Sequence, residues 1–157
     1  MTETNKHASI RPATLADIPA MLKLEQQSAT AGHWTEQQYR DALQFCEGSP
    51  QRFVLVAEHD AAVSAFLIAS HIPPEWELEN IVVVPYIRRQ GLAKRLLDTL
   101  LARARATNSE SVFLEVRESN ISARTLYERS NFEQTGRRKS YYADPQEDAI
   151  LYRLPLK

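Results

Sequence analysis

Four cationic residues crowd the start of one predicted helix, and this feature constrains the fold more than any other. An apolar run, Ile81 to Pro85, precedes the segment RRQGLAKR, which spans residues 88–95. Leucines and alanines then recur with a period near 3.6 residues to about residue 106, which predicts a strand, a turn and an amphipathic helix. A helix start carries a partial positive charge, so cations there are mildly unfavourable. A bound anion would remove this conflict, because N–H groups and cations together attract phosphate.

The basic segment also has a simpler interpretation as solvated surface, and the charge run alone does not decide between the two. Gly91 favours a ligand, since a glycine within the first turn of a helix costs roughly 0.5–1 kcal/mol relative to alanine. Walker-type and dinucleotide-binding glycine motifs are both absent from the sequence. The segment therefore predicts an anion site of another class.

The composition as a whole does not indicate a nucleic-acid or membrane protein. The 157 residues suffice for one domain with its own core, and the formal net charge is -1. The longest stretch without acidic or basic side chains, residues 61–74, is too short and too polar to span a bilayer. A single cysteine, Cys46, fits a reducing compartment, and the four scattered histidines have no metal-ligand spacing. We expect a cytoplasmic protein without a metal.

The remaining pattern predicts a mixed α/β fold. Residues 1–8 are expected to form a flexible leader and residues 9–157 a single domain. The expected order is a strand, two helices, three strands, a helix, a strand, a helix and two strands. A tight turn at His59-Asp60 joins two of the strands, so the sheet is not doubly wound. The strands are expected at 9–12, 52–58, 61–71, 75–84, 111–117, 132–141 and 149–156, and the helices from 14, from 35 to Gly48, at 90–106 and at 120–130.

The basic segment and its surroundings resemble a known family. Arg88-Arg89-Gln90-Gly91-Leu92-Ala93 fits the [QR]-x-x-G-x-[GA] pyrophosphate loop of the GNAT superfamily of acetyl-CoA-dependent N-acetyltransferases. The resemblance covers nearly the whole chain from about residue 9 and is most similar to the ribosomal-protein-alanine N-acetyltransferase branch, the RimI type. It implies a central, mixed, mostly antiparallel sheet of seven strands flanked by about four helices. The further motifs are Glu77–Pro85, Leu114–Asn120, Ala123-x-x-Leu-Tyr127, Asn131-Phe132, Arg138-x-x-Tyr-Tyr142, Glu147–Ala149 and the early segment His33-Trp34-Thr35.

The resemblance implies acetyl-CoA as co-substrate and assigns residues to it. In the family, the strand before the loop splays away from its neighbour, and its backbone groups receive the pantetheine arm and the acetyl group. One N–H donor in such an oxyanion hole is worth about 3 kcal/mol. Asn120 is expected to cap a helix and, by the resemblance, also to contact the cofactor. The other residues assigned in this way are Ile81, Val82 and Val83 on the strand and Arg89, Gln90, Gly91, Leu92, Ala93 and Lys94 in the loop.

Glu115 is the candidate general base. It interrupts the apolar strand 112–116, where a carboxylate is expected to have a raised pKa suited to a base near neutral pH, unless it simply faces solvent. The resemblance aligns Glu115 with the proton acceptor of the branch. It also implies that Tyr127 is the general acid for the departing thiolate, although a core aromatic is the alternative. Glu77 and Glu79 are rival bases, since other superfamily members use an acid on that strand.

The acceptor side is less constrained. Glu77 and Glu79 share one strand face with Glu75 and form either an acidic ridge that favours a basic peptide or a wet strand edge. Trp34 and Tyr141 are candidates to line the peptide groove, or belong to the core. His71 and Cys46 receive no role.

The resemblance also implies a specific reaction. The acceptor would be the N-terminal α-amine of alanine on a small-subunit ribosomal protein, acetylated by direct transfer in a ternary complex. Lysine or small-amine acceptors, and an acyl-CoA-binding module without turnover, are the alternatives. We expect a basic N-terminal peptide as partner, no direct nucleic-acid or membrane contact, and a monomer.

Overall fold

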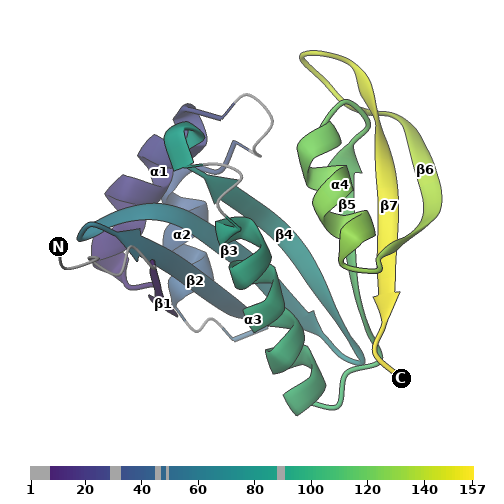
Figure 1. Ribbon diagram of the computed structural model, residues 1–157, viewed down its shortest axis with the longest axis horizontal. Coiled ribbons are helices and arrows are strands. Elements are labelled where there is room, and N and C mark those ends of the chain that lie inside the picture. Colours follow the sequence, from purple (N-terminus) through teal and green to yellow (C-terminus); the bar gives the residue numbers. More distant parts are fainter. Residues whose placement is uncertain (1–7, 29–32, 45–46, 49, 88–90) are drawn as a thin grey trace, which may run out of the picture.

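The chain folds around one seven-stranded sheet (Figure 1). Its strand order is β1-β2-β3-β4-β5-β7-β6, and only the β4–β5 pair is parallel. The mixed, mostly antiparallel sheet and the expected order of strands and helices are confirmed. The computed structural model describes residues 8–28, 33–44, 47–48, 50–87 and 91–157. The strands are β1 (Ser9–Pro12), β2 (Gln51–His59), β3 (Ala62–Ile72), β4 (Glu75–Val83), β5 (Ser111–Arg117), β6 (Glu133–Tyr142) and β7 (Glu147–Pro155).

The helices follow the predicted order with shifted boundaries. The second helix ends at Leu43 rather than at Gly48. The tight turn lies at Asp60-Ala61, one residue later than expected, and both residues have a positive φ, which suits the turn of a two-residue hairpin. Short 3-10 segments at Leu15–Asp17 and Pro85–Ile87 supplement the helices α1 (Ile18–Gln26), α2 (Glu36–Leu43), α3 (Leu92–Ala106) and α4 (Ile121–Arg129).

The expected leader and Cys46 fall largely or wholly outside the described residues. The expected leader lies there except for Ala8, which is buried against the core. Cys46 also lies there. Among the described helices, none is long and apolar enough to cross a membrane.

Helices cover the two faces of the sheet unequally. In Figure 1, α3 and α4 lie in front of the sheet, and α1 and α2 lie behind β1 to β4. Tyr39 of α2 packs edge-on against Phe66 of β3, with ring centroids 5.9 Å apart. Tyr127 of α4 packs against Tyr152 of β7 on the front face, at 6.1 Å. Among the described elements, the rear face of β5, β7 and β6 is therefore left open.

The predicted apolar stripe of α3 forms the centre of the core. Burying a leucine side chain contributes about 1.5–3 kcal/mol, so this helix is held mainly by its packing against β2 to β5. Trp76 of β4 lies under the end of α3 and donates an indole hydrogen bond to Thr107 Oγ1 at 3.1 Å. The buried members of the stripe are Leu92, Leu96, Leu97, Leu100, Leu101 and Ala104.

The parallel strands β4 and β5 pair over only four residues each. The ladder runs from Glu75 opposite Ser111 to Leu78 opposite Leu114. Beyond it, β4 continues to Val83 beside β3, whereas β5 continues beside β7. A bulge in the β3–β4 pairing next to the ladder end turns β4 further. Figure 1 shows the two strands diverging, so the sheet consists of two parts joined by four residue pairs.

The start of the first helical segment is held by an ion-pair network. Asp17 accepts a hydrogen bond from the Thr14 backbone N–H at 2.7 Å, which completes a capping box at the predicted start of the first helix. Arg11 donates to both carboxylate oxygens of Asp17 at 2.8 Å and also pairs with Glu58 of β2. The Arg11 guanidinium, more than the Thr14 N–H, lowers the pKa of Asp17.

We predict that Asp17→Asn lowers the free energy of unfolding at pH 7 by about 1.5–3 kcal/mol, because a charged hydrogen-bonded pair is lost. The folded pKa of Asp17 is lowered, so its contribution is fully present above the ordinary aspartate pKa and is lost as the pH falls through the folded value. Urea unfolding at pH 7 and near pH 2 measures both effects. A difference between the variant and the wild type that does not depend on pH would contradict this assignment.

Candidate active site

Gly91 marks the start of α3 and has a backbone conformation that glycine alone adopts readily. It is the N-cap of the helix, with φ 77° and ψ 9°, not a residue within the first turn as predicted. A Cβ at this position would meet nothing within 4 Å, so the requirement is conformational rather than steric. Arg88, Arg89 and Gln90 lie outside the described residues.

The first turn of α3 presents backbone N–H groups before its hydrogen-bond ladder begins. Arg95 N donates to Gly91 O at 3.0 Å, and this is the first bond of the helix. The N–H groups of Leu92, Ala93 and Lys94 precede it, which is the arrangement that binds anions at a helix start. The Lys94 ammonium is exposed and pairs with Asp98 at 2.8 Å.

The divergence of β4 from β5 positions the residues expected to receive the acetyl group. Val84 N donates to Ser64 O of β3 at 2.8 Å. Backbone groups alternate along a strand, so Val82 also directs its N–H toward β3, and Ile81 and Val83 direct theirs toward the β5 side. At that level the β4–β5 ladder has already ended. The three predicted strand residues therefore border the divergence, but their backbones face two different sides.

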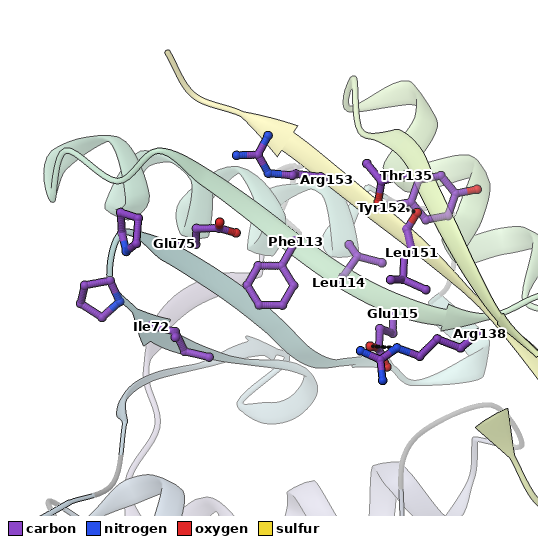
Figure 2. A pocket seen from close by; sticks show the side chains of 12 residues that line it. Ile72, Glu75, Phe113, Leu114, Glu115, Thr135, Arg138, Leu151, Tyr152 and Arg153 are labelled. Atoms are coloured by element: carbon purple, nitrogen blue, oxygen red, sulfur yellow. Dashed lines mark hydrogen bonds and ion pairs between the residues drawn. The ribbon is translucent and has the colours of Figure 1, made fainter.

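Glu115 lies on the rear face of β5, where apolar side chains surround it as predicted but a cation that was not predicted pairs with it. Its carboxylate forms an ion pair with Arg138 Nε of β6 at 3.0 Å, and its side chain is 21% exposed. Figure 2 shows the pair beside Phe113 and Leu151 in an open cavity of about 510 Å³.

Glu77 is a carboxylate on the rear face whose pKa is perturbed by burial. It is paired in register with Ser70 of β3 and Phe113 of β5, at the last but one position of the β4–β5 ladder. Burial raises the pKa of Glu77, and the charges of Glu79 and Glu115 raise it further. A raised pKa was predicted for Glu115 on the neighbouring strand β5, not for Glu77.

Glu79 lies on the same face of β4 as Glu77, but its carboxylate is held by hydrogen bonds from its neighbours. Arg52 Nε of β2 donates to its carboxylate at 2.9 Å, and Ser70 Oγ donates at 2.6 Å. The Arg52 guanidinium also lies over the Trp34 ring, 5.8 Å from its centroid. The predicted acidic ridge thus exists as a shared face of β4, but a cation neutralises one end of it.

Trp34 is held by a buried carboxylate that the sequence analysis missed. Its backbone N–H donates to Glu25 Oε1 at 2.8 Å, and its ring lies 5.5 Å from that of Tyr39. Burial raises the pKa of Glu25, which is 3% exposed. The available signal was spacing, since Glu25 continues the i, i+3, i+7 stripe of Ile18 and Met21 on α1.

Asn120 and Tyr127 lie on α4, on the face of β5 opposite Glu115. Asn120 Oδ1 accepts a hydrogen bond from Ala123 N at 3.2 Å, which confirms the predicted helix cap. Tyr127 is 4% exposed, and burial raises the pKa of its phenol. Its ring packs against Tyr152, which is paired with Leu114, and Glu115 points the other way by alternation. The two proposed proton-transfer groups therefore lie on the two sides of β5.

Tyr141 and Tyr142 end β6 as a T-shaped pair, with ring centroids 5.1 Å apart. Tyr141 is 52% exposed and lies under the Arg138 guanidinium. Burial raises the pKa of Tyr142 to about 12. Tyr142 lies under Arg117, a residue that the sequence analysis did not single out.

Comparison with known proteins agrees with this geometry. Residues 18–132 match the Acetyltransferase (GNAT) family. The chain belongs to the GNAT family of acetyltransferases. It is therefore an acyltransferase, as the resemblance implied.

Two relatives lie close to this GNAT acetyltransferase in sequence and in structure. The [ribosomal protein bS18]-alanine N-acetyltransferase of Escherichia coli K12 is 34% identical over 143 residues, covering 89% of this chain and 92% of the relative. The crystal structure of the Escherichia coli ribosomal-protein-S18-alanine N-acetyltransferase superposes with a TM-score of 0.83 at 31% identity, covering 96% and 94% of the two chains. Ard1 from Thermoplasma volcanium superposes with a TM-score of 0.84 at 26% identity, covering 96% and 99%.

We predict that Glu77→Gln stabilises the enzyme at pH 8 more than at pH 4. The folded pKa of Glu77 is raised, so the folded protein binds more protons than the unfolded chain above the ordinary glutamate pKa, and wild-type stability falls as the pH rises through that window. The glutamine side chain does not titrate in this range, so the variant does not lose stability through this group as the pH rises. Thermal unfolding across pH 4–8 measures it, with Glu133→Gln at the exposed start of β6 as the control. An equal effect of Glu77→Gln at all pH values would contradict the prediction.

Proposed function

We propose that this enzyme transfers an acetyl group from acetyl-CoA to the N-terminal α-amine of an alanine that begins a small-subunit ribosomal protein. The observation that carries the proposal is the early end of the β4–β5 ladder, with Glu115 and Tyr127 on the two sides of β5. The alanine specificity is supported by the 34% identity to a bS18-alanine N-acetyltransferase over nearly the full length of both chains.

The cofactor is proposed to lie along the divergence of the strands. Acetyl-CoA would supply the activated thioester, and the helix start at Gly91 offers N–H groups suited to its diphosphate. The backbone of Ile81 faces the divergence and is suited to the acetyl carbonyl. The other proposed cofactor residues are Val82, Val83, Arg89, Gln90, Leu92, Ala93, Lys94 and Asn120.

The proposed reaction is direct transfer in a ternary complex. The acceptor nitrogen attacks the thioester carbonyl carbon, the C–N bond forms and the C–S bond breaks. Glu115 takes the proton from the nitrogen, and Tyr127 gives its phenolic proton to the leaving sulfur. A raised pKa keeps the Tyr127 phenol protonated near neutral pH, which a general acid requires. Arg138 Nε lies 3.0 Å from the Glu115 carboxylate and is suited to orient it toward the acceptor.

The acceptor is proposed to bind on the rear face, between Trp34 and Tyr141. Glu77, like Glu75, forms no ion pair among the described contacts and lies beside Glu115, so it is suited to a cationic acceptor. Glu79 would act through Arg52, which lies between it and Trp34. Residues 9–157 are proposed to form one N-acetyltransferase domain that works as a monomer in the cytoplasm.

The acceptor assignment is tested by mass spectrometry of peptide products. One basic peptide that begins Ala-Arg and contains an internal lysine is incubated with enzyme and acetyl-CoA, in free and in N-terminally blocked form. We expect one acetyl group on the α-amine of the free peptide and none on the blocked peptide. Acetylation of the lysine would move the function to lysine acceptors, and a lack of any product would favour an acyl-CoA-binding module.

The proton-transfer roles are tested by two substitutions. We expect Glu115→Gln and Tyr127→Phe each to lower kcat by about 10²–10⁴-fold, the usual contribution of a positioned acid or base. Glu110→Gln, an exposed change beside the opposite end of β5, is the matched control and should leave kcat unchanged. Full transfer rates in both active-site variants across pH 6–9 would show that neither residue moves a proton.

A further inference from the structure

Arg117 joins the strand of the proposed base to the turn between β6 and β7. It lies two residues after Glu115 on β5, and its side chain is 15% exposed. Its Nη1 donates to Pro145 O at 3.1 Å, and its Nη2 donates to Ala143 O at 3.3 Å. Nη1 also pairs with Glu147 Oε1 at 3.3 Å. One guanidinium thus holds both sides of the β6–β7 turn.

The same guanidinium stacks on the aromatic ring next to Tyr141, which borders the proposed acceptor site. Arg117 Cζ lies 4.3 Å from the ring centroid of Tyr142, and Tyr142 in turn packs against Tyr141. Arginine can stack through its flat face while its N–H groups bond in the plane, which lysine cannot do. The contact therefore depends on arginine and not merely on a positive charge.

Glu147 extends this connection to the start of α4. Its Oε2 accepts a hydrogen bond from Ser119 N at 2.5 Å, directly before the cap residue Asn120. The hydrogen bonds from Ser119 lower the pKa of Glu147, with Arg117 adding to the effect. The pair of Arg117 and Glu147 thus links β5, the β6–β7 turn and the helix that carries Tyr127.

The end of β6 that bears the two tyrosines depends on these side-chain contacts, because little of it is paired with β7. The β6–β7 pairing shifts once between Gln134 and Gly136, is regular from there to Arg138 opposite Ala149, and shifts again before resuming at Tyr142 opposite Glu147. Ser140, inside the shift, has φ 50°, an uncommon conformation for a residue with a side chain. Side-chain contacts therefore add to the single backbone pairing at Tyr142 in setting the position of Tyr141 and Tyr142.

We propose that Arg117 is a positioning residue that, together with Glu147, holds Tyr141 and Tyr142 against the acceptor and so determines acceptor affinity. The proposal rests on the proposed function, since it assumes that these tyrosines contact the acceptor peptide. It assigns Arg117 no part in proton transfer or in cofactor binding.

The test is a comparison of KM values for the acceptor peptide and for acetyl-CoA in the full-length enzyme. We expect Arg117→Gln and Arg117→Lys each to raise the KM of an Ala-Arg peptide about tenfold. The KM of acetyl-CoA should stay within about twofold and kcat within about threefold. Tyr142→Ala should raise the peptide KM similarly, and combining it with Arg117→Gln should add nothing further, because both changes break one contact.

Arg137→Gln is the matched control. Arg137 lies on β6, the strand that carries Tyr141 and Tyr142. It forms two ion pairs, with Glu118 and Asp148, both at 2.8 Å. Its loss removes two ion pairs, compared with one for the loss of Arg117, but none of the recorded contacts to Tyr142. We expect it to leave the peptide KM within about twofold of the wild type.

Several outcomes would overturn the proposal. Wild-type peptide KM in Arg117→Lys would show that charge alone suffices, and equal rises in both KM values would indicate general loosening of the fold. Additive effects of Arg117→Gln and Tyr142→Ala on the peptide KM would show that the two residues act independently rather than through one contact. If thermal unfolding shows that Arg117→Gln is not folded, the peptide KM values of Arg117→Lys and Tyr142→Ala decide the test. A wild-type enzyme that does not acetylate α-amines would overturn the proposed function itself, whereas an active wild type with unaffected variants overturns this inference alone.

Discussion

The short parallel pairing of β4 and β5 is the constraint on which the site depends. Four residue pairs join the two parts of the sheet, and beyond Leu78 each strand follows a different neighbour. This divergence directs the Ile81 backbone toward an opening rather than toward a partner strand. It also lets the helix start at Gly91 lie at the end of the same strand. A sheet that paired β4 with β5 over their full length would close the place where the thioester is proposed to bind.

Carboxylates gather around the divergence, and their different surroundings give them different chemistry. Glu79 is neutralised by Arg52 and Ser70, Glu115 is paired with Arg138, and Glu77 is perturbed by burial and by the other two charges. Such close carboxylates cannot all behave alike, because each charge raises the cost of the next. The cations around them are arginines from β2 and β6, so the electrostatics of the site depends on strands outside the β4–β5 pair.

Local patterns predicted the elements well, and contacts between distant segments were the part they could not predict. The periodic leucines of α3, the cap at Asn120 and the alternation along β4 are visible within a few residues and were confirmed. The ion pair of Glu115 was not predicted because its partner, Arg138, lies 23 positions later, and a register shift in β6 follows directly after Arg138. No spacing rule in a single sequence encodes such a shift.

Amide hydrogen exchange with and without acetyl-CoA tests the central claim most directly. If the divergence of β4 and β5 holds the thioester, the cofactor should slow exchange at Ile81 and at the first-turn amides Leu92 to Lys94. The amides of the β6–β7 turn should exchange at the same rate in both states. Saturating acetyl-CoA that leaves Ile81 and the first turn of α3 unchanged, while protecting another part of the chain, would contradict the account.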